Sequence, residues 1–319
     1  MKLIHVVAAA ALVTALPLAL MAQNRDRLQR DRLQRDRLQI DTTVSIERQG
    51  SVDLSLVSGR IRVTGWDRKD VKVTASIDEG SLKFNANPSR VTLGVDNRDG
   101  SRRRHGSLGD ARFDVFVPRG TRLILEAVSG DIIASGVQGE IEAGSVSGDV
   151  SVTGAVRDVS LESVSGSVHV SQVTGNLSAE SVSGDVRAEG ISGNVEASTV
   201  SGTVRLLGIQ TRYVRTESVS GDIIYTGNID PAGKYDFESH SGSLRLNLPR
   251  GAGAQFEVET FSGDVDSDFA ITMQPGERKR NKGRFEFTIG DGKARVSAQT
   301  FSGRIIINDT STDSPTRRD

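Results

Sequence analysis

Carboxylates recur at a fixed position in this sequence, directly after a series of Ser-Gly pairs. The residue after each pair is acidic in five of eight cases, the series being Asp131, Asp149, Ser167, Asp185, Thr203, Asp222, Ser243 and Asp264. Stacked carboxylates could bind Ca²⁺, which prefers oxygen ligands. Calcium-binding β-rolls use a nine-residue glycine-rich repeat, which this chain lacks. We therefore interpret these residues as turn caps, in which Gly adopts a positive φ and Asp accepts hydrogen bonds from the next backbone amides.

Three aspartates near the C-terminus imitate the start of an EF-hand loop. Asp264, Asp266 and Asp268 occupy its first, third and fifth positions. The sixth position is Phe269 instead of Gly, and the twelfth is Pro275 instead of Glu. Both substitutions remove what the calcium loop requires. The sequence therefore predicts no metal site and no cofactor.

Two further columns carry charge at the repeat spacing. An acidic column lies two residues before each recurrent triplet and comprises Glu126, Glu162, Glu180, Glu217, Glu238 and Glu259. A partly basic column comprises His169, Arg187, Arg205 and Arg245. Like charges on neighbouring strands repel, so both columns cost stability. They are either solvated faces that protect the edges, or one charged face that binds an envelope protein or polymer. In the second case the candidate binding residues are Glu162, Glu180, Glu217, Glu238, Glu259, Arg187, Arg205 and Arg245.

An enzyme built on a β-helix is the main competing class. Polysaccharide lyases and glycosidases need clustered carboxylates with a base or a metal, whereas the acidic residues here follow the repeat. His105, His169 and His240 lack metal-ligand spacing. No nucleophile elbow, phosphate loop or HExxH motif occurs in the sequence. Trp66, the single tryptophan, could stack on a sugar but is expected to cap the core. The sequence predicts no catalytic residues.

Overall charge argues against a nucleic-acid partner. The chain has 40 Lys and Arg against 41 Asp and Glu, so it has no basic field. Two basic stretches, Arg102–His105 and Arg278–Lys282, are interpreted as solvated loop tips. Cysteine is absent, which excludes disulfides and a lipid-modified N-terminal cysteine.

Residues 1–22 are typical of a cleaved export signal. Lys2 is followed by an apolar run from Val6 to Leu20 and by a small residue, Ala22. The run is interrupted by Pro17 and is shorter than the roughly 20 residues that span a bilayer. Residues 23–39 contain three copies of RDRLQ, and their leucines form no helical stripe because they recur every five residues. We predict a low-complexity tether there and no transmembrane segment in the mature chain.

Alternating apolar residues begin at Ile40 and predict half-buried strands. Val52, Leu54 and Leu56 lie two residues apart with polar residues between them. The pattern is less regular over 78–110 and returns at Phe113. We assign 40–126 to an N-terminal β cap.

The triplet [VHF]-Ser-Gly then recurs through the rest of the chain. Its glycines are Gly130, Gly148, Gly166, Gly184, Gly202, Gly221, Gly242, Gly263 and Gly303, the first five being 18 residues apart. A second series lies half a repeat away, in Val137–Gly139, Val173–Gly175 and Ile191–Gly193. Each repeat therefore contains two strands and two turns. The sequence predicts an all-β single-chain solenoid over 127–308, built of two-strand coils of about 18 residues.

Stacking such coils pairs the backbone of each with its neighbours and joins the apolar side chains into a continuous core. Val150 is expected above Val168 and Val186. The triplet valines are also assigned to the core: Val128, Val146, Val164, Val182, Val200 and Val219. Phe261 and Phe301 are expected to widen the last coils. Residues 270–284 are assigned to a hairpin tip, 303–308 to the closing strand and 309–319 to a disordered tail.

The order of three motifs resembles the DUF4097-type family, exported bacterial β-strand repeat proteins described as adhesins. The motifs are Gly59-Arg-Ile-Arg-Val-Thr-Gly-Trp-Asp67, Val117-Pro-Arg-Gly120 and the Ser-Gly-Asp-Ile series that starts at Ser129. The resemblance covers about residues 45–308 and implies a β-solenoid at the cell envelope. It transfers no catalytic residues, and the RDRLQ copies lie outside it.

These observations favour a non-catalytic adhesion or scaffold module of the cell envelope. The alternative is a periplasmic sensor or regulator of envelope stress that acts through protein contacts, and a polysaccharide-active enzyme ranks behind both. The chain is expected in the periplasm, at the cell surface or outside the cell. Its partner is an envelope protein or polymer whose identity, like the oligomeric state, the sequence leaves open.

Overall fold

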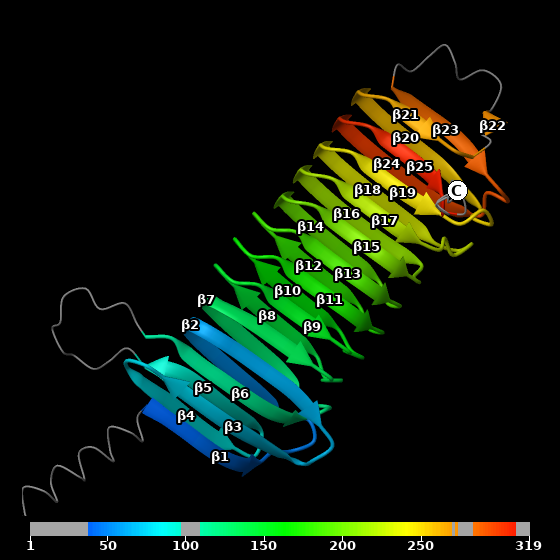
Figure 1. Cartoon of the computed structure of the whole chain (residues 1–319). Helices are drawn as coiled ribbons and strands as arrows, with labels where there is room; N and C mark the ends of the chain where they lie inside the picture. The colour runs from blue at the N-terminus through cyan, green and yellow to red at the C-terminus, as the bar shows by residue number, and fades with distance from the viewer. Residues whose placement is uncertain (1–37, 97–108, 270–271, 274–282, 311–319) are drawn as a thin grey trace, which may run out of the picture.

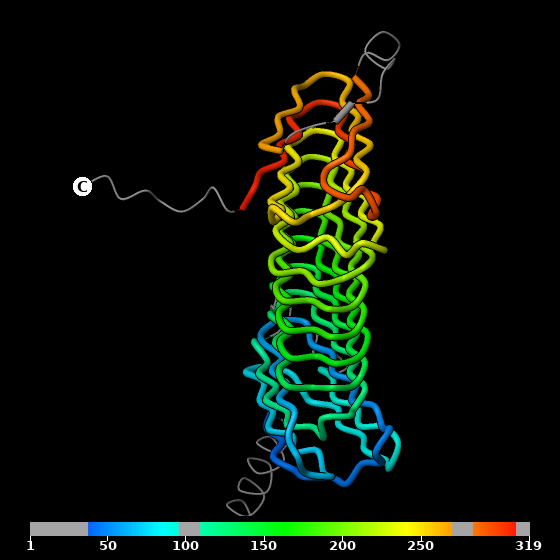
Figure 2. The backbone as a smooth tube through the Cα atoms, turned by 90° about the vertical axis from the view of Figure 1, so that its right-hand side faces the viewer, coloured from blue at the N-terminus to red at the C-terminus, as the bar shows by residue number. Residues whose placement is uncertain are grey.

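The structure is a computed structural model that describes residues 38–96, 109–269, 272–273 and 283–310. These residues form a straight rod of short strands, and Figure 1 shows successive strands lying side by side along its length. Figure 2, turned by 90°, shows the coils as flattened loops stacked one above another. Hydrogen bonds join all 25 described strands. The prediction of an all-β solenoid is confirmed.

Several predicted segments lie outside the described residues. They are the export signal, residues 23–37 of the tether, the Arg102–His105 loop, Arg278–Lys282 and residues 311–319.

The coils have two long faces. In spatial order, the strands of the first face are β4 (Ser81–Asn87), β5 (Arg90–Asp96), β2 (Ser51–Trp66), β7 (Arg122–Ser135), β8 (Ile141–Ser145), β10 (Val159–Ser163), β12 (Leu177–Ser181), β14 (Val195–Ser201), β16 (Tyr213–Ser220), β18 (Lys234–Ser241), β24 (Ala294–Ser302), β20 (Ala254–Ser262) and β23 (Arg284–Ile289). Each strand that continues the solenoid from β2 to β20 is parallel to its neighbours.

The second face begins where each coil turns after its Ser-Gly pair. Its strands, in spatial order, are β1 (Gln39–Ser45), β3 (Asp70–Ile77), β6 (Ala111–Pro118), the second halves of β2 and β7, β9 (Val150–Thr153), β11 (Val168–Val173), β13 (Val186–Ile191), β15 (Val204–Ile209), β17 (Ile223–Gly227), β19 (Leu244–Leu248), β25 (Ile305–Asp309) and β21 (Val265–Ser267). The two-residue β22 (Thr272–Met273) pairs with β23.

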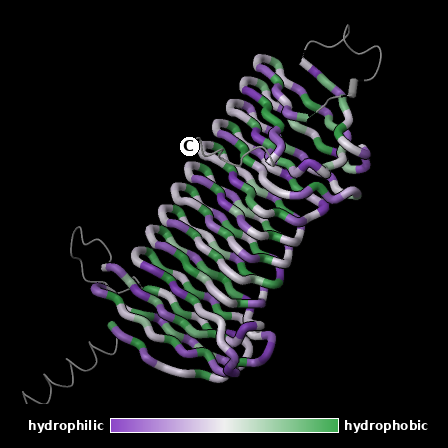
Figure 3. The backbone as a smooth tube through the Cα atoms, turned by 45° about the vertical axis from the view of Figure 1, so that its right-hand side comes forward, coloured by the Kyte–Doolittle hydropathy of each residue, from purple (hydrophilic) through white to green (hydrophobic). Residues whose placement is uncertain are grey.

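Residues 18 apart are vertical neighbours, as the repeat predicts. Val168 pairs with Val150 on one side and with Val186 on the other. These side chains are fully buried. Burial of one such side chain contributes about 1.5–3 kcal/mol. Because every coil adds similar side chains to the same file, the core runs along the whole rod, and Figure 3 shows hydrophobic positions alternating with hydrophilic ones on each coil.

The triplet valines are not in the core, which corrects the prediction. Val128, Val146, Val164, Val182, Val200 and Val219 are 43–50% exposed, Phe301 is 50% exposed and Phe261 is 79% exposed. Alternation explains the error, because the residue before each valine points inward and the valine therefore points outward. The inward position holds a small hydroxyl residue, such as Ser163 or Thr199, that is buried. The narrow corner is filled by these hydroxyl side chains.

The C-terminal end is arranged differently from the prediction. Strand β25, predicted to close the rod, lies between β19 and β21, and β24 lies between β18 and β20. Strand β23 runs antiparallel along the other edge of β20, and its Phe287 stacks on Phe256 at 5.2 Å between ring centroids. Because β23 occupies that edge, the last coil inserts on the inner side of β20. The coil of β20 and β21 is the one that closes the rod.

At the N-terminal end the two faces extend separately beyond β2. Strands β4 and β5 form an antiparallel pair on the first face, with β5 parallel to β2. On the second face, β3 is antiparallel to both β6 and β1. The described residues contain no helix that is both long and apolar enough to cross a membrane.

Candidate functional site

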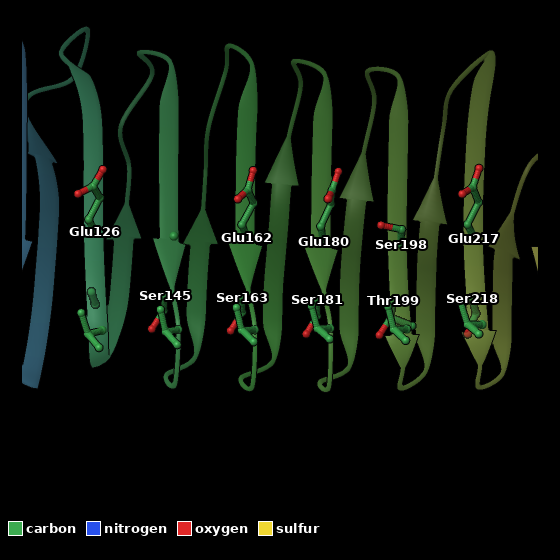
Figure 4. Close-up of a pocket in the computed structure, with 18 of the residues that line it drawn as sticks. Glu126, Ser145, Glu162, Ser163, Glu180, Ser181, Ser198, Thr199, Glu217 and Ser218 are labelled. Carbon is green, nitrogen blue, oxygen red and sulfur yellow. The ribbon is translucent and has the colours of Figure 1, made fainter. Parts of the chain in front are cut away.

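A groove of about 870 Å³ runs along the first face beside the Ser-Gly corner. It crosses successive coils from the β2 level to β18, and three parallel rows of residues line it. The glutamate row and the hydroxyl row are shown in Figure 4. The third row contains the exposed triplet valines. We call this feature the corner groove.

The three rows follow from three consecutive residues on every first-face strand. At the end of β10, Glu162 points outward and Ser163 inward, and Val164, the residue that follows the strand, points outward. Strand pairing places Glu162 beside Glu180 and Ser163 beside Ser181. Because the coils are in register, each residue type forms a row along the rod. The glutamate and valine rows form two walls, and the buried hydroxyl row lies between them.

The hydroxyl row ties each coil to the one before it. The Ser163 hydroxyl donates to the Gly148 carbonyl at 3.1 Å and accepts from the Gly166 amide at 2.9 Å. Ser181 repeats both bonds, at 3.0 Å to the Gly166 carbonyl and 3.0 Å from the Gly184 amide. Ser218, also buried, has no hydrogen-bond partner among the described residues. The row therefore stabilises the groove floor in most coils.

The glutamate row has a distinct order. From β7 to β24 its positions are Glu126, Gly144, Glu162, Glu180, Ser198, Glu217, Glu238 and Gln299. Starting at Gly144, every third position in this row is thus uncharged. Among the described residues, only Glu217 of these glutamates has an ion-pair partner, Arg215. This hydrogen-bonded contact raises the pKa of the Arg215 guanidinium. The other four carboxylates remain as uncompensated charge beside the groove.

The basic candidate residues lie on the other face. Arg187 and Arg205 pair directly with each other across β13 and β15, and Arg245 follows on β19. Two of them have acidic neighbours, Arg187 with Glu189 and Arg205 with Asp185 at 3.4 Å. The eight candidates therefore divide between two faces. Four glutamates, Glu162, Glu180, Glu217 and Glu238, line the corner groove, whereas Glu259 lies beyond Gln299 on β20.

The aspartates that follow Ser-Gly cap amides of the adjacent coil. Asp149 accepts from the Ser167 amide at 2.8 Å, and Asp185 accepts from the Thr203 amide at 2.8 Å. The prediction of a positive φ at the preceding glycine is wrong for most coils, including that of Gly166. Glycine is needed there because a Cβ on Gly166 would lie 2.0 Å from the Gly148 carbonyl oxygen. The described residues contain no group of three or more His, Cys, Asp or Glu that could hold a metal ion.

Aromatic residues have structural roles. The Trp66 indole donates to the Asp70 carbonyl at 2.8 Å and stacks on Phe116 near the N-terminal end. Tyr225 and Tyr235 are fully buried, and burial raises the pKa of both phenols. The Tyr235 hydroxyl donates to the Thr211 carbonyl at 2.6 Å. Both tyrosines therefore remain protonated at neutral pH and bridge backbone segments.

Sequence reasoning missed the valine wall. Alternation gives this wall only if it continues past the end of β10, so that Leu161 and Ser163 point inward while Glu162 and Val164, the residue after the strand, point outward. In that case, each glutamate is followed two residues later by a second side chain that faces the solvent. The order of coils beyond Val219 carried no comparable signal, because His240 is followed in space by Phe301 and then Phe261. These three rings stack in that order, with centroid distances of 5.0 and 4.8 Å.

A family model described as "Toastrack DUF4097" matches residues 51–308, which is most of the chain. The chain belongs to this family. The match begins at the first residue of β2 and ends in β25, and so covers the Toastrack solenoid and its corner groove.

Crystal structures with similar folds also have low sequence identity to this chain. A "putative adhesin" from Bacteroides fragilis is 12% identical, with a TM-score of 0.41 over 84% of this chain and 96% of that one. A "putative lipid binding protein" from Parabacteroides distasonis is 14% identical, with a TM-score of 0.41 and the same coverage. A "putative cell adhesion protein" from Clostridium sporogenes is 13% identical, with a TM-score of 0.24 over 85% of this chain and 100% of that one.

Proposed function

We propose that this Toastrack protein is exported and acts in the cell envelope as a non-catalytic adhesion or scaffold module. The observation that supports this proposal is the corner groove. It is a continuous surface along the rod, with a row of exposed valines and a row of carboxylates that mostly lack ion-pair partners within the described part of the chain. Exposed apolar rows of this kind are typical of interaction surfaces. The repulsion between neighbouring carboxylates also favours binding of a cationic ligand, because such a ligand would reduce that repulsion.

Site-specific crosslinking in the native host tests the proposal. A photoreactive residue at Val182 in the groove is compared with one at Ser151 on the second face, and envelope fractions are probed for products. The groove position should yield one defined envelope product. Equal products from both positions would show that the rod has no preferred binding face.

Charge variants complete this test. Replacing Glu162, Glu180 and Glu217 with Gln should abolish the crosslink without lowering the melting temperature, because exposed charges contribute little to stability. The matched control replaces Arg187, Arg205 and Arg245 with Gln, which removes three charges from the other face. Loss of the crosslink in this control alone would place the partner on the second face and overturn the proposal.

A further inference from the structure

We infer that the corner groove binds an extended segment of a partner protein in which Lys or Arg alternates with aliphatic residues. This inference rests on the proposed function and adds the chemical class of the ligand. The two walls differ in chemistry, with carboxylates such as Glu162 on one side and valines such as Val164 on the other. An extended chain presents alternate side chains in opposite directions. A segment lying along the groove would therefore direct its cations to one wall and its aliphatic side chains to the other.

The number of glutamates per unit length of the rod matches such a segment. Two of every three positions in the row are glutamates, as in Glu162, Glu180 and the uncharged Ser198. Three coils advance about 14–15 Å along the rod, since neighbouring strands lie about 4.8 Å apart. Four residues of an extended chain advance about 13–14 Å and place two side chains on the same side. Two cations per three coils therefore meet two carboxylates per three coils.

The acidic wall is available for such a ligand. Among the described residues, no basic side chain pairs with Glu126, Glu162, Glu180 or Glu238. Two of the three candidate arginines on the second face, Arg187 and Arg205, have acidic neighbours of their own. Neighbouring carboxylates on paired strands, such as Glu162 and Glu180, repel each other. A ligand cation near both would remove that repulsion as well as forming ion pairs.

The valine wall favours aliphatic over aromatic ligand side chains along most of the groove. It consists of β-branched side chains at every coil from Val128 to Val219. Beyond Val219 the row continues with His240, Phe301 and Phe261, which already stack on each other. Six intervals of about 4.8 Å separate Glu126 from Glu238, so the groove accommodates roughly eight or nine extended residues.

The test uses a synthetic probe with four Lys-Val pairs between Gly-Ser ends, labelled with a fluorophore. Its control has the same composition in blocks, four Lys followed by four Val. Binding to the full chain is measured by fluorescence anisotropy at low ionic strength and again at high ionic strength. The alternating probe should bind several-fold more tightly than the block probe, and salt should weaken it. Equal binding of the two probes would overturn the inference.

Protein variants test the two walls separately. The double variant Glu162→Gln, Glu180→Gln should bind the alternating probe about fivefold more weakly than the parent chain. The control pair Glu142→Gln and Glu196→Gln lies on the same face outside the groove and should not change the affinity. The triple variant Val164→Thr, Val182→Thr, Val200→Thr keeps β-branched side chains and should lower the affinity for the alternating probe about tenfold. An unchanged affinity in either groove variant would sink the inference.

A charge-conserving exchange tests the spacing itself. Combining Glu180→Ser with Ser198→Glu leaves the net charge unaltered and breaks the two-in-three order. The alternating probe should bind this variant less tightly than the parent chain. Equal affinity would show that the row acts only as diffuse negative charge, and the assignment of an extended strand would be wrong.

Two other occupants are distinguished by further measurements. Sedimentation that shows a dimer, lost in the valine variant, would assign the groove to a second copy. A variant lacking residues 25–37, which contain Arg and Leu, should bind the probe as the full chain does. Much tighter binding would assign the groove to this segment instead. The two proposals can also fail separately. If the glutamine variant lost the Val182 crosslink but the parent chain did not bind the alternating probe, the proposed function would stand and this ligand class would be rejected.

Discussion

Glycines at the corners of the coils serve two different physical purposes. At the Ser-Gly corner, successive backbones approach so closely that a Cβ on Gly166 would overlap the Gly148 carbonyl oxygen at 2.0 Å. At the opposite corner, Gly136, Gly154, Gly190 and Gly208 have left-handed φ values of 63–76°. A Cβ on Gly190 would meet nothing nearer than 4.0 Å. The Ser-Gly glycines thus require the absence of a side chain, whereas these four glycines of the opposite corner require only a conformation.

One coil makes this difference visible. Gln172 occupies the glycine position of the second corner and has a φ of 57°, the only positive φ at a described non-glycine residue. No described coil of the solenoid has a side chain larger than hydrogen at the Ser-Gly glycine. Conformational strain of about 1–2 kcal/mol can be tolerated in one coil, whereas overlap with a neighbouring backbone would displace the stack.

Gly166→Ala should have the largest effect, because it introduces the overlap at the Ser-Gly corner. We expect a loss of about 3 kcal/mol or more in unfolding free energy, measured by urea denaturation and by hydrogen exchange at neighbouring coils. Gly144→Ala is the matched control, since a Cβ there meets nothing within 4 Å. A Gly166→Ala chain as stable as the control would show that the coils can separate without cost.

Ser163→Ala tests what the hydroxyl row adds to the same corner. The change removes both hydrogen bonds of Ser163 and leaves the Gly166 amide without its partner. A cost of about 1–3 kcal/mol is expected in urea denaturation. Ser218→Ala is the comparison, because the Ser218 hydroxyl has no partner among the described residues. It should cost nothing or stabilise slightly, and equal losses in the two variants would contradict the assigned role.

Gly190→Ala measures the conformational requirement of the second corner. The added methyl group has room, so the cost should be only the left-handed φ, about 1–2 kcal/mol. Unfolding by urea under the conditions used for Gly166→Ala provides the comparison. If this variant lost as much stability as Gly166→Ala, the distinction between the two corners would fail.

Gln172→Gly should give the smallest effect, and in the opposite direction. It relieves the positive φ but adds freedom to the unfolded chain, so the two contributions partly cancel. A gain of about 0.5–1 kcal/mol is expected, visible as a higher melting temperature. A decrease would indicate that the Gln172 side chain makes stabilising contacts that outweigh its strain.

Repeat spacing alone was sufficient to predict the solenoid, the register and the core files of the strands, but not the exposure of the triplet valines. A separation of 18 residues between Val150, Val168 and Val186 admits one simple explanation, because only stacked coils bury such residues together. Membership of the family was likewise expected from the order of short motifs. The glutamate column was also found from spacing, since it needs no knowledge of the third dimension.

Only the tertiary structure decided which residues face the solvent at the corners and how the last coils are ordered. The outward position of Val164 depends on how the alternation of inward and outward side chains continues through the turn. The insertion of β24 depends on β23 occupying the outer edge of β20. Both are choices between arrangements with the same local pattern. Spacing along the chain specifies which residues become neighbours, whereas packing and edge pairing determine which surface they leave exposed.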